Sequence, residues 1–314
     1  MKSGRVLQRT GWSAAFRALV GLGLLLLTGT ALARDAAAEA LAGRHQALQA
    51  ALAASPLGLP LLVQSHDERG QVQGEAHALL SPPFADLLAR LRQPRAWCDV
   101  LLLHLNVKGC LHESAADGDR LTLYSGRKLY EPMSDASPLR LRWTLVAARA
   151  DHLQVELTAA DGPMGTGDYR ITLAALPVEQ GSFVHFRYAY RSSALSRLAV
   201  DTYLATLGRD KVGFTVLGTG SDGHPLFVGG QRGVVERNAV RYLLAVQADL
   251  EVERRGATSE QPFEQGLARW FELTERWPRQ LHELDRDDYL AIKRRERAEQ
   301  LRRQQTLDRA AGRP

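Results

Sequence analysis

The sequence predicts an α+β fold in which an antiparallel sheet packs against one long amphipathic helix. Two observations lead to this prediction. Apolar and polar residues alternate over five segments in the middle of the chain, which is typical of strands with one buried face. After these segments, residues 233–254 place Val235, Ala239 and Tyr242, among other apolar side chains, on one helical face.

The elements before the five segments can be placed from turn and helix signals. Residues 35–54 carry a stripe of leucines and predict a helix that ends before Pro56. Two strands are expected near 61–66 and 71–80, and a helix is expected to open after Ser81-Pro82-Pro83. The chain therefore begins its folded part with a helix, a hairpin and a second helix.

Short turns separate the central strands and predict hairpins, at residues 150–151, 161–163 and 180–181. Helices are expected again over 194–207, 261–276 and 286–309. Trp270, Phe271 and Trp277 form a stripe that predicts packing of the 261–276 helix onto the domain. The last helix is charged nearly all round, so we interpret it as solvated or partner-binding.

A perfect G-x-G-x-x-G runs from Gly218 to Gly223 and raises the question of a dinucleotide site. Such a loop follows a strand and opens a helix, whose N-terminus holds the pyrophosphate. Here residues 212–217 read as a strand, but residues 224–228 read as a second short strand rather than a helix. We therefore interpret the motif as the turn of a hairpin, without nucleotide binding.

The N-terminus predicts export. Four basic residues precede or begin an uncharged apolar run over 18–32, and Ala31-Leu32-Ala33 is a small-x-small cleavage pattern. The run is short for a membrane span, although an uncleaved N-terminal anchor is the alternative. We expect residues 1–33 to be a signal peptide cleaved near Ala33, and the mature protein to be periplasmic or secreted.

The charge distribution argues against nucleic acid as a partner. The whole chain carries a net charge of +5, but residues 1–33 hold four basic and no acidic side chains, which leaves +1. Residues 293–314 hold eight basic and three acidic side chains, so residues 34–292 carry −4. A nucleic-acid-binding domain needs a basic face on its folded part, and the basic residues here gather at the chain ends.

The two cysteines, Cys98 and Cys110, predict a disulfide in an oxidising compartment. A continuous strand between them would hold the sulfurs roughly 40 Å apart, because a strand rises about 3.3 Å per residue. The bridge therefore requires a reversal, such as a short helix over 97–104 followed by a turn. Two free thiols are the alternative, and no zinc-ligand spacing surrounds them.

Two segments carry a family resemblance. Residues 74–110, GEAHALLSPPFADLLARLRQPRAWCDVLLLHLNVKGC, and residues 167–193, GDYRITLAALPVEQGSFVHFRYAYRSS, resemble the early segment and the late hairpin of the START-like, Bet v1-like superfamily. This superfamily is also called the polyketide cyclase/dehydrase and lipid-transport group. Segments 203–216 and 229–245 further resemble exported proteobacterial proteins with this domain.

The resemblance implies a helix-grip fold, in which a curved antiparallel sheet surrounds the long helix with an apolar cavity between them. Together with the N-terminal signal and the helix patterns, it predicts four parts: a signal peptide at 1–33, an N-terminal helix at 34–57, a START-like domain at 58–255, and accessory C-terminal helices with a basic tail at 256–314. The chain departs from the family pattern at about 194–230, where a helix and a hairpin are inserted, and again after 260.

The candidate ligand-binding residues are aromatic side chains that share an inward strand face and polar side chains of the long helix. They are Trp143, Tyr169, Phe186, Tyr188, Tyr190, Arg237, Arg241 and Tyr242. The aromatic residues suit either core packing or a pocket lining. Arg237 or Arg241 could hold a carboxylate or phosphate through a bidentate guanidinium, or form ion pairs on a solvated face together with Arg232, Glu236 and Asn238.

No catalytic motif of the hydrolase, zinc-protease or nucleotide-binding kinds is present, and we predict no catalytic residue, metal or cofactor. For His104, Asn106 and Lys108 we weigh the mouth of a cavity against a capping or surface role.

The favoured function is an exported, non-enzymatic binding or carrier protein for a hydrophobic, lipid-like small molecule. The alternatives are a cavity enzyme of cyclase or hydrolase type, using His185 or Glu156, and an envelope interaction protein with a filled core. A peripheral contact with the membrane or an envelope protein is expected through residues 286–314.

Overall fold

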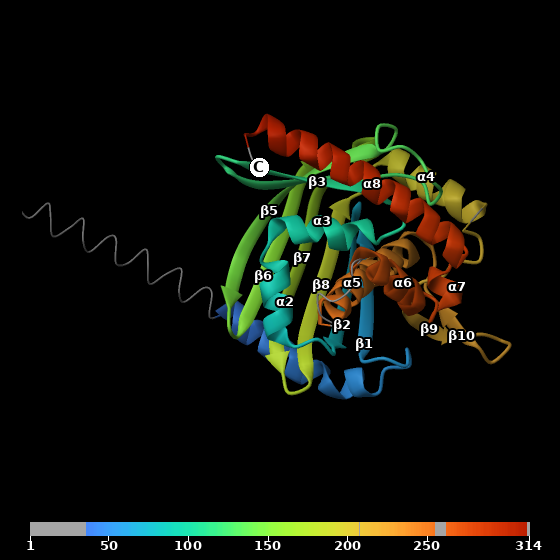
Figure 1. Cartoon of the computed structure of the whole chain (residues 1–314). Helices are drawn as coiled ribbons and strands as arrows, with labels where there is room; N and C mark the ends of the chain where they lie inside the picture. The colour runs from blue at the N-terminus through green and yellow to red at the C-terminus, as the bar shows by residue number, and fades with distance from the viewer. Residues whose placement is uncertain (1–35, 207, 255–261, 313–314) are drawn as a thin grey trace, which may run out of the picture.

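The computed structural model describes residues 36–206, 208–254 and 262–312, and shows a curved sheet wrapped around a long helix (Figure 1). The expected signal peptide at 1–33 lies outside the described residues and stays a prediction. Within the described ranges, no helix combines the length and the apolar character that crossing a membrane requires.

Eight antiparallel strands form one sheet in the order β1-β2-β8-β7-β6-β5-β4-β3. Their bounds are β1 Leu61–Glu68, β2 Gln71–Leu80, β3 Val107–Ala115, β4 Gly118–Ser125, β5 Ser137–Arg149, β6 His152–Asp161, β7 Gly167–Val178 and β8 Gly181–Arg191. The pairing of β2 with β8 brings the N-terminal hairpin beside the last strand. Helices α2 (Phe84–Leu91) and α3 (Pro94–Leu102) fill the connection from β2 to β3, and a short 3-10 turn, η1 (Pro163–Gly165), precedes β7.

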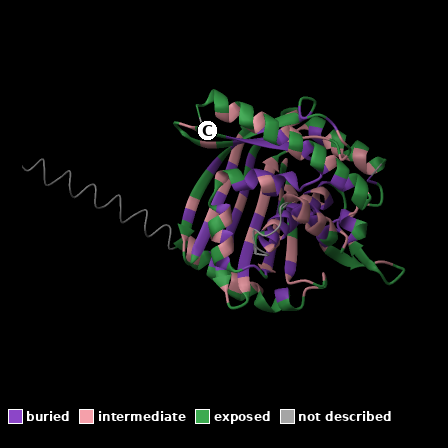
Figure 2. Cartoon of the chain, in the orientation of Figure 1, coloured by how far each residue is buried: buried purple, intermediate pink, exposed green. Residues whose placement is uncertain are grey.

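The concave face of the sheet holds α5 (Gly230–Arg254), so the expected helix-grip arrangement is confirmed. The inward strand residues are buried, as Figure 2 shows by the alternation of colours along the strands. Gly74 on β2 allows the close approach of the helix, because a Cβ there would lie 2.8 Å from the carbonyl oxygen of Val235. Helix α6 (Pro262–Thr274) covers α5 from the other side, which buries α5 on nearly every face.

The convex face is covered near β1, β2, β8 and β7 by a helix over residues 36–53. Leu41 and Leu52 of this helix pack with Ala174, Leu176 and Phe183 of the sheet, in a cluster separate from the main core. The sheet therefore has buried residues on both sides at this end, which explains why β7 and β8 contain apolar residues beyond strict alternation.

The predicted disulfide between Cys98 and Cys110 is present. Cys98 lies in α3 and Cys110 in β3, and their Cα atoms are 5.0 Å apart. The chain reverses between the two cysteines as the bridge requires, because the short helix α3 ends at Leu102 and a turn leads into β3 at Val107.

The segment between β8 and α5 contains α4 (Ala194–Ala205) and a hairpin of β9 (Val216–Thr219) with β10 (Pro225–Phe227). The G-x-G-x-x-G motif forms the turn of this hairpin, as expected from the sequence. Gly223 has a φ of 80°, which a tight turn requires and which glycine adopts without strain. Helix α5 begins only at Gly230, so no helix N-terminus opens inside the motif.

The interpretation of the last helix as solvated was wrong for one of its faces. After the short α7 (Pro278–Leu281), α8 (Arg286–Ala310) lies along β3, at the outer edge of the sheet (Figure 1). Gln300 Oε1 accepts the Cys110 N–H at 2.8 Å. Gln304 accepts the His112 N–H at 2.8 Å and donates to the His112 carbonyl at 2.9 Å. These amide side chains bond an edge that would otherwise be open to another strand.

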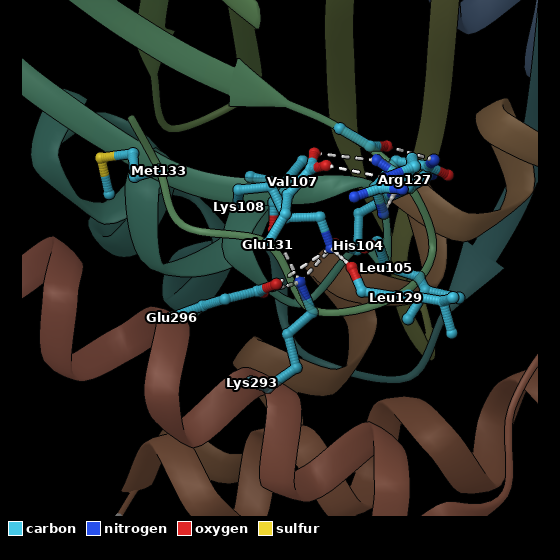
Figure 3. A network of polar contacts seen from close by, with 12 residues as sticks. His104, Leu105, Val107, Lys108, Arg127, Leu129, Glu131, Met133, Lys293 and Glu296 are labelled. Atoms are coloured by element: carbon cyan, nitrogen blue, oxygen red, sulfur yellow. Dashed lines mark hydrogen bonds and ion pairs between the residues drawn. The ribbon is translucent and has the colours of Figure 1, made fainter. Parts of the chain in front are cut away.

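A buried ionic network fixes the same helix closer to its N-terminus (Figure 3). The ammonium groups of Lys108 and Lys293 both contact Glu296, at 2.9 and 2.8 Å. Lys108 also donates to the carbonyls of Leu105 and Leu129. Because the side chains of Lys108, Lys293 and Glu296 are at most 1% exposed, the surface role weighed for Lys108 is wrong.

Candidate functional site

An aromatic layer lies between the concave face and α5. Tyr169 of β7 and Tyr188 and Tyr190 of β8 contact one another, with the rings of Tyr169 and Tyr190 stacked at 5.5 Å. Tyr242 of α5 completes the layer, with its ring 5.9 Å from Phe186 and 6.0 Å from Tyr188. Five of the eight predicted site residues are thus brought together. Tyr188 and Tyr190 keep partial exposure, whereas Phe186 is buried.

Trp143 shares the inward face but lies farther away. The strand registers place it in the row Trp143, Leu157, Ile171 and Tyr188, which crosses β5, β6, β7 and β8. Its indole Nε1 is buried without a hydrogen-bond partner among the described residues. Trp143 therefore extends the apolar face beyond the tyrosines and adds one unused donor to it.

The tyrosines stay neutral over the physiological range. Burial raises the pKa of Tyr188 and of Tyr242 well above the usual value, and raises the pKa of Tyr190 to about 12. Tyr169 shares a 2.8 Å hydrogen bond with the hydroxyl of Thr166. The layer can therefore offer apolar ring faces and neutral hydroxyls, but no phenolate.

A cluster of charged side chains adjoins the aromatic layer, and we call it the cationic cluster: Lys128, Arg237, Arg241 and Glu283. Glu283 Oε1 accepts hydrogen bonds from Lys128 at 2.6 Å and from Arg241 at 2.7 Å. Arg237, one turn before Arg241 on α5, donates to the carbonyl of Val212 at 3.1 Å. The solvated face weighed for this part of α5 is wrong, because Arg237 and Arg241 are each 2% exposed.

The cluster contains more positive than negative charge. Burial lowers the pKa of Lys128 to about 8, because the attraction of Glu283 is opposed by Arg241 and does not offset desolvation. Burial, followed by Arg241, lowers the pKa of Arg237 to about 10. Burial alone would raise the pKa of Glu283, but Arg241 and Lys128 more than reverse this and lower it. Within the cationic cluster, the Glu283 carboxylate is thus the one negative charge beside the three cationic side chains.

Other carboxylates near α5 are already in use. Glu236 is fully buried one residue before Arg237, and its two oxygens accept hydrogen bonds from Ser65, Phe214 and Thr215. The Nε atoms of Arg237 and Arg241 are buried without a partner in the described part of the chain. Two guanidinium donors are therefore left over beside an excess of positive charge.

His104 joins the cationic cluster to the aromatic layer. Its ring stacks on Tyr242 with centroids 4.4 Å apart, and it is 1% exposed rather than at the surface as we had weighed. Its Nδ1 accepts the Asn106 N–H, which places the ring proton on Nε2, an atom without a well-formed bond among the described residues. Burial and then the charge of Arg241 hold its pKa well below the ordinary value, although the nearby Asn238 side chain opposes that shift.

The two residues considered for a cavity enzyme lie on the other face of the sheet. His185 alternates with Phe186 and contacts Glu75 at 3.0 Å. Glu156 pairs with Arg170 at 2.5 Å on the convex side of β6 and β7. Neither side chain faces the aromatic layer, so that version of the enzyme hypothesis loses its candidate acid and base.

An open groove of about 680 Å³ lies at one end of the sheet, between α2 and the turns that follow β5 and β7. Pro83, Phe84, Leu88, Pro177 and Val178 are among its lining residues. None of the eight predicted site residues lines it. The apolar cavity between sheet and helix, which the sequence suggested, stays a prediction.

Sequence reasoning missed Lys128 and Glu283. They come from the β4–β5 connection and from the segment between α7 and α8, far from α5 in sequence. No spacing or motif links them to Arg241, so only the fold reveals the cluster. The 194–230 insertion, flagged as a departure from the family pattern, supplies Tyr203 beside Lys128.

Comparison with known proteins gives similarity of fold. No family model and no curated protein matches the chain. Among solved structures, the Zhui aromatase/cyclase from Streptomyces sp. R1128 is 14% identical, with 63% of this chain and 99% of that chain covered and a TM-score of 0.36. The STAR-related lipid transfer protein from Xanthomonas axonopodis is 12% identical, with 61% and 93% covered and a TM-score of 0.34. Norcoclaurine synthase from Thalictrum flavum is 15% identical, with 48% and 79% covered and a TM-score of 0.28.

The helix-grip architecture predicted from the sequence is confirmed at the level of fold. It rests on this chain's own strand order and on the long helix held in the concave face. The proteobacterial branch and the four domain boundaries stay predictions.

Proposed function

We propose that the protein binds an amphipathic anion, with the apolar part of the ligand against the aromatic layer and its carboxylate or phosphate in the cationic cluster. The observation that carries this proposal is the pair of buried guanidinium Nε atoms of Arg237 and Arg241, which have no partner among the described residues and lie beside an excess of positive charge. Leaving such donors buried and unbonded is costly, and an anionic group would satisfy them.

The position of the cluster supports the same conclusion. Arg241 and Tyr242 are adjacent on α5, and the His104 ring stacks on Tyr242 while it lies among the same charges. A ligand spanning the two regions would meet ring faces at one end and hydrogen-bond donors at the other. Small-molecule sites usually combine groups in this way, with mainly apolar contacts and a few polar ones.

We further propose that binding takes place outside the cytoplasm, in the periplasm or after secretion. The apolar run and cleavage pattern of residues 1–33 support this proposal, and so does the Cys98–Cys110 disulfide, since disulfides persist in oxidising compartments.

The test compares two ligands that differ only in the headgroup. Dodecanoate and dodecanol are titrated into the untagged mature protein, with tyrosine and tryptophan fluorescence and calorimetry as readouts. We expect dodecanoate to bind about tenfold or more tightly than dodecanol, because hydrogen bonds to charged groups contribute about 1.5–3 kcal/mol.

Arg241→Met is expected to remove this preference, whereas Arg232→Met on the same helix, whose Nε bonds Ser65 instead, should keep it. Thermal unfolding of both variants confirms that they are folded. Equal affinity for the two ligands in the unmodified protein, or no binding of either, would contradict the proposed function.

A further inference from the structure

Three metal-ligand side chains meet on the convex face, on the opposite side of the sheet from the aromatic layer. Glu75 and His77 are two residues apart on β2, and His185 is the direct antiparallel partner of His77 on β8. Glu75 Oε2 lies 3.0 Å from His185 Nε2 and 4.0 Å from His77 Nε2. One ligand atom from each of the three residues lies within 4.8 Å of the others.

The cluster is enclosed rather than exposed. The side chains of Glu75, His77 and His185 are 13%, 2% and 15% exposed. The two imidazole rings stack with centroids 4.4 Å apart and planes inclined by 6°. Extended backbone and the cross-strand register hold the three groups together, and rotation of the stacked rings about their side-chain bonds would direct both Nε2 atoms at one ion without movement of the strands.

The contact between His185 and Glu75 marks the place that an ion would take. His185 Nε2 lies 3.0 Å from Glu75 Oε2, within hydrogen-bond distance. A metal ion bound there would replace any proton between these two atoms, because metal ligands must be deprotonated.

The helix over residues 36–53 contributes a competing cation. Arg44 Nη1 lies 3.4 Å from Glu75 Oε2 and 3.3 Å from His77 Nε2, the atoms that a metal ion would use. Arg187 lies 4.0 Å from the other oxygen of Glu75, which also accepts a hydrogen bond from Gln73. The Arg44 side chain is 47% exposed, so it can move out to solvent.

We propose that Glu75, His77 and His185 form a binding site for a divalent transition-metal ion such as Zn²⁺. Two imidazoles and one carboxylate are a donor set that zinc and its neighbours in the first transition row accept, with one coordination position left for water. Ligand atoms of a tetrahedral zinc site are about 3.3 Å apart, given zinc–ligand distances of about 2.0–2.1 Å. The ion takes the place of the Arg44 guanidinium, which connects metal binding to the position of this helix on the sheet.

The test measures zinc binding to the untagged mature protein by equilibrium dialysis, with Co²⁺ absorption as a report on the ligands. We expect one equivalent of metal. Glu75→Gln and His185→Asn should each weaken binding by at least about 10- to 100-fold, since loss of an outer-shell partner of a ligand already costs that much. His66→Asn, which changes an exposed histidine of β1, is the matched control and should leave binding unchanged. His77 is left intact because it is the most buried of the three.

Arg44→Ala gives a prediction of opposite sign. Removal of a cation from the metal's place should strengthen zinc binding severalfold, whereas a purely structural ion-pair cluster would show no zinc binding in any variant. Failure of the unmodified protein to bind one equivalent, or binding that Glu75→Gln and His185→Asn leave intact, overturns the proposal. Thermal unfolding without metal verifies that each variant is folded.

Discussion

Lys128 is expected to take up a proton when an anionic ligand enters the cationic cluster. Its pKa is lowered from 10.5 to about 8, chiefly by burial. That difference disfavours the charged ammonium by about 3 kcal/mol, because one pKa unit corresponds to about 1.4 kcal/mol. A carboxylate placed beside Lys128 would favour the charged form and return its pKa toward the ordinary value.

The size of the effect follows from linkage. In the free protein at pH 8 about half of the Lys128 side chains are charged, so a ligand that holds Lys128 charged takes up about half a proton. Above pH 8 the affinity for the ligand should fall, by at most about tenfold per pH unit, until the pKa of the complex is reached. The ligand carboxylate, with a pKa of about 4.5, stays ionised throughout this window.

The assay is calorimetric titration of dodecanoate at pH 7, 8 and 9, each in two buffers with different ionisation enthalpies. The difference in heat between buffers gives the number of protons taken up. Lys128→Met should abolish both the uptake at pH 8 and the fall in affinity above it, and dodecanol serves as the neutral ligand control. Zero uptake at pH 8 in the unmodified protein, or the same uptake in Lys128→Met, would refute the reasoning.

Three further predictions concern stability and assembly. Reduction of the disulfide should lower the free energy of unfolding by roughly 3 kcal/mol in urea denaturation, and an unchanged midpoint would contradict this. Glu296→Gln leaves two buried ammonium groups without their carboxylate and should cost about 3–5 kcal/mol, whereas the exposed Arg302→Gln should stay within about 0.5 kcal/mol. Replacement of Gln300 and Gln304 together by alanine opens the β3 edge and should cause concentration-dependent association in light scattering; an unchanged molar mass at all concentrations would argue against the edge-covering role.

Most of the fold could be predicted from the sequence because it follows local rules. Alternation marked the central strands, and glycine-containing turns marked their connections; the β1–β2 turn at Arg69 and Gly70 has positive φ at both residues, as a two-residue hairpin requires. The need to bring Cys98 and Cys110 together also predicted a short helix near residues 97–104, and α3 is that helix. The aromatic layer followed from the same alternation, since Phe186, Tyr188 and Tyr190 are two residues apart on one strand.

The long-range polar contacts could not be predicted in the same way. Helix α8 has few apolar residues, so its pattern indicated a solvated helix. Beyond Tyr289 and Leu290, however, its buried face continues with the polar residues Lys293, Glu296 and Gln300. Polar side chains bury well only when specific partners meet them, and a single sequence does not reveal partners. The Glu75, His77 and His185 group had a weak local signal, an acid and a histidine on the same strand face, but its third member depends on the pairing of β2 with β8.

Two buried cationic groups in this molecule show why burial alone does not identify a binding site. Around Glu296, the Lys293 ammonium has three acceptors, the carbonyls of His104 and Val107 and the carboxylate, which matches its three donors. Lys108 is satisfied equally, so this network is complete and serves to hold α8. The guanidinium groups of Arg237 and Arg241 are also buried, but their Nε donors have no acceptor within the part of the chain that the structure describes. The described residues thus bond every ammonium donor around Glu296 but leave two Nε donors without an acceptor beside the aromatic layer. This difference is the physical basis for assigning the anion to Arg237 and Arg241.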